Sequence, residues 1–444
     1  MHRIQVLLYQ NQMRAPAARF VSRLTNNTIA LILAGGRGER LGSLTEWRTK
    51  PAVPFAGRFR IIDFSLSNCV HSGINKVCVL TQYKSHSLIR HLIQGWTKLN
   101  SERGDFLDVI PAQQWTDDET WYQGTADAVY QSLDIIESHQ PDYVIILAGD
   151  HVYHMDYGEM LAEHVNMGAD FSIACLRVPV NVAAGQLGVL EIDENNRVQS
   201  FDEKPEKPKT LLGDAGHVFA SMGIYVISRK YLSKRLREDA QLQDSSHDFG
   251  KDIIPSGIKS GDYFHAHKFQ NPYDDGDPYW RDVGTVDSFF SANMELLSAD
   301  PPLDLYNGSW PTLTNQPQLP PASFTGTKGC TDIRESMVSG GCVLSDSKLK
   351  HSLLFSSVWV EQGCRLNRVL ALPGCRIGAG SRISNAILDN RCDIPAGTVI
   401  GEDPVADSEK FNLTEGKVVV VNRTMLGQHR SYMPGVQLPT TRFD

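Results

Sequence analysis

A repeat of 17 residues near the end of the chain restricts the possible folds more than any other feature. Three series of apolar residues share this period: Val343, Val360, Ile377 and Ile394; then Leu349, Leu366, Ile383 and Ile400; and finally Leu353, Leu370 and Ile387. Three apolar positions per turn, separated by glycines and small polar residues, predict a triangular parallel β-helix whose inward side chains stack. A β-sandwich is the alternative, but it gives alternation without a fixed long period.

The part of the chain before the repeat alternates two kinds of pattern. Short apolar runs predict strands at 29–34, 76–81, 143–148 and 171–176. Apolar residues at helical spacing predict helices at 85–96 and 125–138. Strands that are apolar on both faces and separated by helices predict a Rossmann-like α/β fold, with a mostly parallel sheet covered on both sides. Sheets of this type commonly bind nucleotides.

Composition divides the chain into four parts. Residues 1–28 are expected to be a loose N-terminal tail, because their apolar stretch is too short for the core of a signal peptide. Residues 29–300 carry the α/β pattern. Residues 301–330 are rich in proline, glycine and polar residues and predict a linker. The β-helix then takes residues 331–444.

Composition also limits the possible partners. The chain has 51 acidic and 43 basic residues, and the resulting charge of −8 argues against a general nucleic-acid binder. No stretch of the sequence approaches the ~18 continuous apolar residues of a membrane span. The eight cysteines lack C-x-x-C spacing, as expected for reduced thiols. Together these features predict a cytoplasmic protein that binds neither nucleic acid nor membrane.

The stretch "LILAGGRGERLG", residues 31–42, is an apolar run followed by glycines and arginines. Glycines let backbone N–H groups close around an anion, and arginines help to neutralise it, so the loop predicts a phosphate site. It fits neither a dinucleotide fingerprint, because Leu41 stands at the third glycine position, nor a P-loop, because the required lysine is missing. An ordinary glycine turn after a buried strand is the alternative.

Two aspartates are candidates for holding a metal ion. Asp150 follows a predicted strand directly, and the carboxyl ends of strands face the ligand crevice in an open α/β sheet. Asp282, in "YWRDVGT", is the best partner for sharing a Mg²⁺ ion, which prefers one or two carboxylates together with phosphate oxygens. The alternative for Asp150 is an ordinary helix cap or turn former.

Charged segments supply further candidates for binding anions. In "FDEKPEKP", residues 201–208, Pro205 stiffens the backbone beside Lys204, which could act on a phosphate, while Glu203 could accept hydrogen bonds from sugar hydroxyls. A solvated turn is the alternative. The segment 49–68 adds the cations Lys50, Arg58 and Arg60.

These motifs occur in the order and spacing of one family. They are the glycine loop with Arg40-Leu41, Lys50-Pro51, "WYQGTADAV", "LAGDH", "FDEKP", "ASMGIY", "SSHDFGKD" and "YWRDVGT". Over about residues 25–425 the chain resembles the bacterial glucose-1-phosphate adenylyltransferases. The resemblance implies a nucleotidyltransferase domain followed by a left-handed parallel β-helix. It also implies the conversion of ATP and glucose 1-phosphate to ADP-glucose and diphosphate, for glycogen synthesis.

The resemblance assigns roles to individual residues. Arg37 and Lys50 would hold the triphosphate of ATP, and Asp150, the third predicted catalytic residue, would share Mg²⁺ with Asp282. The nucleotide site would comprise Leu33, Gly35, Gly36, Gln82, Gly124 and Thr125. The glucose 1-phosphate site would comprise Tyr122, Gly188, Glu203, Lys204 and Ser221, with Lys204 on the phosphate.

The resemblance further implies an allosteric homotetramer that binds small anionic effectors between its two domains. A sugar phosphate would activate the enzyme, and AMP or phosphate would inhibit it. Arg48, Arg60 and Arg423 are the candidate effector residues. The chain departs from the family pattern at Trp47, where a lysine is expected, at Pro54, where a histidine is expected, and at Ser138 and Ser384, where arginines are expected. These departures leave the identity of the effectors open.

Three other functions compete with this interpretation. The nearest is a sugar nucleotidyltransferase that uses UTP or dTTP. The second is a regulatory subunit without catalysis, which the presence of Asp150, Asp282 and Lys204 disfavours. The third is an acyltransferase with a catalytic histidine in its β-helix, for which His351 is the candidate.

Overall fold

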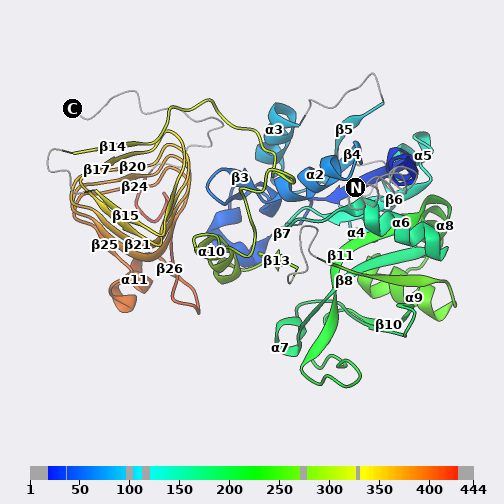
Figure 1. Ribbon diagram of the computed structural model, residues 1–444. Helices are drawn as coiled ribbons and strands as arrows, with labels where there is room; N and C mark the ends of the chain where they lie inside the picture. Colours follow the sequence, from blue (N-terminus) through cyan, green and yellow to red (C-terminus); the bar gives the residue numbers. More distant parts are fainter. Residues whose placement is uncertain are drawn as a thin grey trace, which may run out of the picture.

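Four parallel strands form the centre of the first part of the molecule. In the computed structural model, which describes residues 19–36, 38–96, 104–112, 121–270, 278–326 and 331–428, they lie side by side (Figure 1). Their order is β5 (Phe106–Pro111), β4 (Lys76–Thr81), β1 (Thr28–Leu33) and β6 (Tyr143–Ala148). The bounds of β4 and β6 are those expected from the sequence. β1 begins and ends one residue earlier than expected.

Beyond β6 the sheet changes direction. The long strand β11 (His217–Ser228) runs antiparallel to β6, β8 (Phe171–Pro179) and β9 (Val189–Ile192). The sheet ends with β10 (Val198–Asp202), antiparallel to β9, and with β12 (Phe264–Lys268), parallel to β8. The sequence predicted the parallel centre, but its apolar runs carried no information about the reversed direction of β11.

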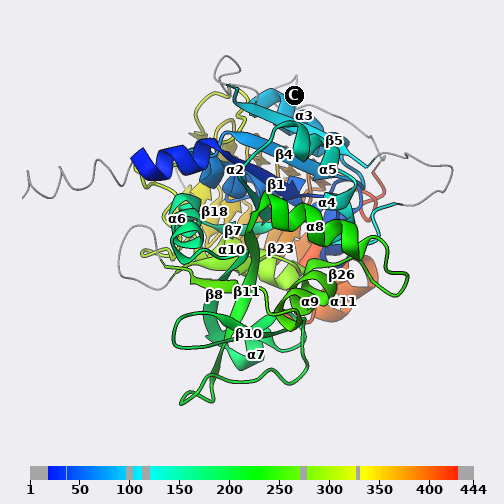
Figure 2. The same cartoon turned by 90° about the vertical axis from the view of Figure 1, so that its right-hand side faces the viewer.

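Helices cover both faces of this sheet (Figures 1 and 2). Successive residues of β1 point to opposite sides: Ile32 joins one buried cluster and Leu31 the other. The first cluster includes side chains of α2 (Ile62–His71), α3 (His86–Gly95) and α6 (Tyr157–Met167). The second includes side chains of α4 (Thr125–Tyr130), α5 (Leu133–Ser138), α8 (Arg229–Asp239) and α9 (Ile254–Lys259).

The helix expected at 125–138 is two helices, α4 and α5. The break falls at Gln131 and Ser132. The Ser132 hydroxyl donates a hydrogen bond to the Ala128 carbonyl at 3.0 Å, a bond that competes with the regular helical pattern. The expectation of one continuous helix was therefore wrong.

The segments outside the predicted sheet region also have structure. Residues 19–26, within the expected tail, are helical, and Leu24 packs against the core. In the expected linker, Trp310 Nε1 donates to Asn68 Oδ1 at 2.9 Å, and the Thr314 hydroxyl donates to Asp63 Oδ2 at 2.6 Å. The linker segment is thus attached to α2. It also contains β14 (Ser323–Thr325), the first strand of the β-helix.

The last part of the chain is a β-helix with three faces of parallel strands, consistent with the left-handed type. The first face comprises β14, β17 (Val343–Ser345), β20 (Trp359–Val360), β22 (Arg376–Ile377) and β24 (Asp393–Ile394). The second comprises β15 (Asp332–Arg334), β18 (Lys348–Lys350), the beginnings of β21 (Arg365–Ala371) and β23 (Arg382–Leu388), and β25 (Val399–Ile400). The third comprises β16 (Met337–Val338), β19 (Leu353–Leu354), the ends of β21 and β23, and β27 (Val419–Val421). The helix α11 (Pro404–Lys410) and the strand β26 (Asn412–Leu413), antiparallel to β27, complete this part.

The second predicted series, which begins at Leu349 and Leu366, stacks inside the β-helix as expected. The first series was wrong at one position. Leu344, not Val343, pairs with Val360 and is buried, because the turn from Leu344 to Val360 spans 16 residues, one fewer than the two turns that follow it.

The third series, Leu353, Leu370 and Ile387, stacks in register but does not point inward. Their strand neighbours Leu354, Ala371 and Leu388 fill the interior instead. Since side chains alternate along a strand, the third series faces outward. It is apolar because the α/β part of the molecule covers it.

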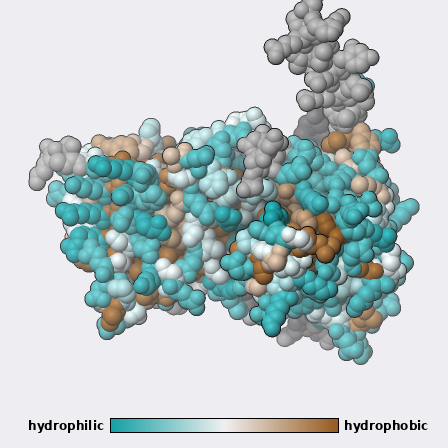
Figure 3. Space-filling model, turned by 60° about the horizontal axis from the view of Figure 1, so that its bottom comes forward, coloured by the Kyte–Doolittle hydropathy of each residue, from teal (hydrophilic) through white to brown (hydrophobic). Residues whose placement is uncertain are grey.

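The contact between the two parts is formed largely by α10 (Val286–Glu295), which lies between them in Figure 1. Phe289 and Phe290 share one buried cluster with the outward third series. The Arg368 guanidinium lies 5.5 Å from the centre of the Phe290 ring. On the face shown in Figure 3 the β-helix, at the left, presents mostly hydrophilic side chains, as expected for a surface in contact with water.

The remaining short elements are η1 (Glu39–Thr45), η2 (Lys50–Ala52), β2 (Pro54–Phe55), β3 (Phe59–Arg60), β7 (His151–Tyr153), α7 (Val180–Ala183), η4 (Phe249–Ile253) and β13 (Trp280–Asp282). Among the described residues, none of the helices is both long and apolar enough to span a membrane. The seven described cysteines are buried and free.

Candidate active site

The carboxyl ends of β1, β4 and β6 bring several predicted site residues together. Leu33 ends β1, and the glycines after it approach the end of β4 so closely that a Cβ on Gly35 would lie 3.1 Å from the Cβ of Gln82. After β6, a Cβ on Gly149 would lie 3.1 Å from the Leu33 carbonyl oxygen. The glycines therefore allow three loops to pack at one edge of the sheet.

A pair of short strands brings Asp282 to the same edge. β7 follows Asp150 and pairs antiparallel with β13, so that His151 lies opposite Asp282. The two aspartates, distant in the sequence, thereby lie on either side of one lysine. Lys50 Nζ donates to Asp150 Oδ2 at 2.9 Å and to Asp282 Oδ1 at 2.7 Å.

We call Lys50, Asp150 and Asp282 the charge centre. In it, one cation lies within hydrogen-bond distance of two carboxylates. Burial lowers the pKa of Lys50, but the two aspartates outweigh burial, and the net pKa is raised. Burial likewise raises the pKa of Asp150, but the charges of Lys50 and His151 outweigh it and hold the pKa well below its usual range. Near neutral pH the lysine is therefore a cation and Asp150 an anion.

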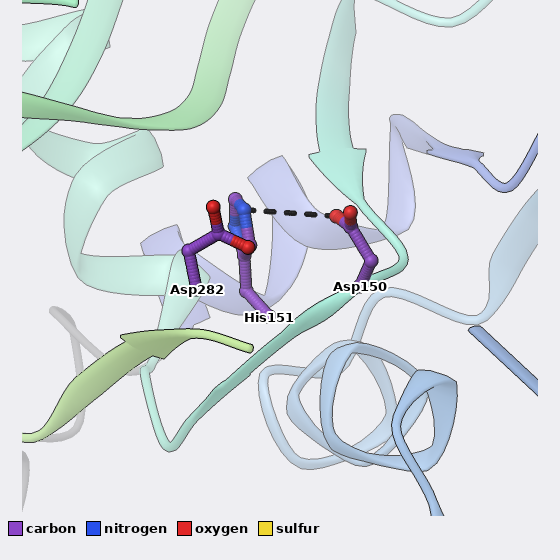
Figure 4. A group of neighbouring side chains, drawn as sticks. All are labelled: Asp150, His151 and Asp282. Atoms are coloured by element: carbon purple, nitrogen blue, oxygen red, sulfur yellow. Dashed lines mark ion pairs between the residues drawn. The ribbon is translucent and has the colours of Figure 1, made fainter. Parts of the chain in front are cut away.

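Asp150, His151 and Asp282 also form a group that could hold a metal ion (Figure 4). One ligand atom from each lies within 4.8 Å of the others, and His151 Nε2 is 3.6 Å from Asp150 Oδ1. Carboxylate oxygens suit a hard cation such as Mg²⁺, and here oxygens of both aspartates already contact one cation, the Lys50 ammonium. The residues present therefore fit a divalent ion.

Four of the residues predicted to bind the sugar phosphate lie close to one another. A Cβ on Gly188 would lie 3.0 Å from Glu203 Oε2, and the Gly188 carbonyl accepts a hydrogen bond from the Ser221 N–H at 2.8 Å. Lys204 has a left-handed backbone with φ of 50°, and its exposed side chain places Nζ 3.6 Å from Glu203 Oε1. Burial raises the pKa of Glu203, although Lys204 opposes this effect.

Gly124 and Thr125 stand at the beginning of α4, next to the loop 245–250. A Cβ on Gly124 would lie 2.2 Å from the His247 carbonyl oxygen, so only glycine fits there. The Thr125 hydroxyl donates to Asp248 Oδ2 at 2.9 Å and accepts from the Phe249 N–H at 3.1 Å. Tyr122, just before them, is half-buried, and burial raises its pKa.

Some site residues differ from the expectation or were missed. Arg37 lies outside the described residues. A Cβ on Gly36 would meet no other atom within 4 Å. His151 was missed as a member of the metal group, although it directly follows Asp150 in "LAGDH". Arg40, not assigned a role beforehand, has its guanidinium 3.8 Å from Asp282.

The chain matches two known families and many known proteins. Residues 29–299 match the family described as Nucleotidyl transferase, and residues 320–421 match the one described as GlmU-like, C-terminal hexapeptide. Glucose-1-phosphate adenylyltransferase 2 of Alkalilimnicola ehrlichii is 54% identical over 418 residues, which cover 93% of this chain and 98% of that protein. The chain belongs to the glucose-1-phosphate adenylyltransferase family.

Two other members of the family are similarly close. Glucose-1-phosphate adenylyltransferase of Nitrosococcus oceani is 53% identical, with 94% of this chain and 99% of that protein covered. That of Teredinibacter turnerae is 52% identical, with 93% and 98% covered. The similarity to these adenylyltransferases thus extends over nearly the whole chain.

The residues expected to bind effectors lie near the contact between the two domains. Arg48 forms a buried ion pair with Asp389 of the β-helix. Burial lowers the pKa of Arg60 to about 10, although Asp63 opposes this effect, and the Arg60 guanidinium donates to the Ala52 carbonyl at 2.9 Å. Arg423 is half-buried. Burial lowers the pKa of Arg391, and the charge of Arg423 lowers it further.

A cavity of about 480 Å³ also lies between the domains. Its lining residues are Glu39, Gly42, Ser43, Thr45, Glu46, Tyr83, Lys84, Asn412, Asn422 and Met425. Trp47, which departs from the family pattern, is 45% exposed and follows Glu46 in the chain. The cavity has two carboxylates and one lysine, an unusual lining for a site that would bind a polyanion.

Proposed function

We propose that this protein is a glucose-1-phosphate adenylyltransferase, which converts ATP and glucose 1-phosphate to ADP-glucose and diphosphate. The observation that carries the proposal is the charge centre of Lys50, Asp150 and Asp282, which lies next to the glycine loop after β1, where a Cβ on Gly38 would lie 3.1 Å from the Lys50 Cβ. Close relatives named for this activity cover nearly the whole chain.

In the reaction, an oxygen of the sugar phosphate forms a bond to the α-phosphorus of ATP. The bond from that phosphorus to the oxygen bridging the β-phosphate breaks, and diphosphate leaves. Both substrates are anions, so the protein must hold two negatively charged groups together. Lys50 and Arg37 bind the triphosphate of ATP, and the exposed Lys204 side chain binds the phosphate of glucose 1-phosphate. Glu203 accepts hydrogen bonds from the sugar hydroxyls.

We propose Mg²⁺ as the metal ion. The carboxylates of Asp150 and Asp282 would hold it, with His151 beside them, and when bound it would supply positive charge to phosphate oxygens at the reacting centre. The nucleotide site comprises Leu33, Gly35, Gly36, Gln82, Gly124 and Thr125. The sugar phosphate site comprises Tyr122, Gly188, Glu203, Lys204 and Ser221.

The proposal extends to regulation and assembly. The enzyme is a cytoplasmic homotetramer whose residues 29–300 catalyse and whose β-helix, from β14 onward, serves regulation and assembly. Small anionic effectors bind near Arg48, Arg60 and Arg423. The altered residues Trp47, Pro54, Ser138 and Ser384 give this chain an effector preference of its own.

A phosphate-release assay coupled to pyrophosphatase tests the function. The purified full chain with Mg²⁺ and glucose 1-phosphate is offered ATP, UTP or dTTP in parallel. The proposal expects phosphate release with ATP at a kcat/KM at least about 100-fold above the other two, the size of discrimination that a base pocket can provide. A preference for UTP or dTTP would overturn the assignment of the nucleotide, and no release with any nucleotide would overturn the activity.

A further inference from the structure

The loop 245–250 contacts both substrate sides at once. On the nucleotide side, the His247 carbonyl accepts hydrogen bonds from the N–H groups of Ala126 and Asp127, at 2.8 and 3.2 Å. These are N–H groups of the first turn of α4, which other parts of the helix cannot satisfy. The loop therefore caps α4 and fixes the turn that carries Gly124 and Thr125.

The other end of the loop fixes Glu203. A Cβ on Gly250 would lie 2.5 Å from Glu203 Oε2, so the backbone at Gly250 is packed directly against the carboxylate. Asp248 holds this end of the loop, because its Oδ1 accepts from the N–H groups of Gly250 and Lys251 at 2.9 and 3.1 Å. The distance between the two substrate sides thus depends on the shape of one short loop.

The His247 imidazole and the Asp239 carboxylate hold the loop in this shape. His247 has a left-handed backbone with φ of 52°, which is unfavourable for a residue other than glycine. Its Nδ1 lies 2.7 Å from Oδ2 of Asp239, a buried residue at the end of α8. Because a carboxylate only accepts hydrogen bonds, Nδ1 is the donor. Asp239 Oδ1 also accepts from the Ser245 hydroxyl at 2.7 Å, and the Ser245 Oγ accepts from the His247 N–H at 3.0 Å.

His247 lines a cavity of about 160 Å³. Asp239, Gln123, Asp127 and Tyr130 also line this cavity. The charge centre of Lys50, Asp150 and Asp282 is not part of its lining. The imidazole therefore acts on the loop through its hydrogen bond to Asp239.

We propose that Asp239 and His247 are positioning residues for the adenylyl transfer. Their hydrogen bond holds the left-handed turn at His247, and this turn keeps the ATP side, at Gly124 and Thr125, and the sugar side, at Glu203, in fixed relation. The inference rests on the proposed function. Neither residue contacts the reacting atoms; both act through the backbone of the loop.

Kinetics of two variants at position 247 test this role. His247→Ala removes the donor, whereas in His247→Asn the side-chain Nδ2 takes the place of Nδ1 and the residue tolerates a left-handed backbone. We expect His247→Ala to raise the KM for ATP and the KM for glucose 1-phosphate together, each about fivefold or more, as for the loss of one hydrogen bond. His247→Asn should restore both KM values to within about twofold of wild type. Asp239→Asn should resemble His247→Ala.

The matched control is His217→Ala, which removes a similar pair, between His217 Nδ1 and Asp214, at a partly exposed turn. It should leave both KM values unchanged. A purely structural role for His247 would lower the melting temperature without changing either KM, and this result overturns the inference. A change confined to one substrate, or equal defects in the Ala and Asn variants, also overturns it. An inactive wild type would instead indicate failure of the proposed function.

Discussion

The β-helix and the substrate edge of the sheet bring their important side chains together in different ways. In the β-helix, Leu366 stacks on Leu349 and Ile383, residues one turn away along the chain. At the substrate edge, Lys50 meets aspartates that lie far from it in the sequence. Regular spacing is thus sufficient to build an apolar interior, whereas the charge centre exists only once the whole sheet has formed.

The energetic consequences differ as well. An inward leucine of the β-helix contributes through the burial of apolar surface, so its loss creates a cavity and lowers stability. Each group of the charge centre contributes through the charge of the others. Its loss leaves an uncompensated charge where, in the proposed mechanism, two anionic substrates meet. Substitutions in the two regions should therefore affect different measured quantities.

The largest effect is expected at the charge centre. Asp150→Asn keeps the size of the side chain but removes its charge, which matters most as charge develops at the phosphorus. We expect kcat to fall about 10³-fold with only a modest change in either KM. Steady-state kinetics measure this, and Asp300→Asn, at an exposed position, is the control. Near-normal turnover of Asp150→Asn would show that the centre is not catalytic.

The next largest effect is expected in the free energy of unfolding. It tests an inward leucine of the β-helix, Leu366, and an outward one, Leu370. Leu366→Ala leaves a cavity inside the β-helix, and Leu370→Ala leaves one under α10. We expect each variant to lose about 3 kcal/mol of unfolding free energy in urea titrations. If Leu370→Ala were nearly neutral, as for an exposed residue, the packing of the third series against α10 would be wrong.

A smaller effect is expected on the sugar side. Lys204→Ala removes a cation from the proposed phosphate contact and should raise the KM for glucose 1-phosphate about 30-fold, with little change in the KM for ATP. Lys207→Ala, an exposed lysine three residues later, is the matched control. Equal increases in both KM values would remove Lys204 from the sugar phosphate site.

The smallest effect is expected in the pH dependence of the kinetics, in which Glu203 and Asp150 should differ. Burial raises the pKa of Glu203, whereas Lys50 and His151 hold that of Asp150 below its usual range. On acidification Glu203 therefore takes up a proton before Asp150 does. We expect the KM for glucose 1-phosphate to rise a few-fold on the acid side while kcat holds, and Glu203→Gln to abolish this pH dependence. An acid loss of kcat with constant KM would contradict the assignment.

The sequence predicted those parts of the fold that depend on local patterns. The bounds of β4 and β6 and the inward series through Leu366 follow from apolar runs and from the repeat. The third series was predicted to point inward, because a sequence does not show whether an apolar residue faces its own interior or another domain. The direction of β11 could not be predicted for a related reason, since strand pairing across the sheet is a long-range property.

For the candidate site, residue types and strand ends indicated Asp150 and its partner Asp282. The pattern did not indicate that Lys50 bridges them, because this contact depends on how η2 packs in the folded chain. Nor did it indicate the positioning role that we propose for Asp239, at the end of α8, and His247, in the loop that follows. Such supporting contacts have no spacing rule.

The most direct test of the account is whether Asp150 and Asp282 hold one divalent ion between them. Mn²⁺ can be titrated into the purified full chain and followed by electron paramagnetic resonance, in wild type, Asp150→Asn and Asp282→Asn. The account predicts a site in wild type whose affinity falls at least about tenfold in each variant. Unchanged Mn²⁺ affinity in both variants would contradict it.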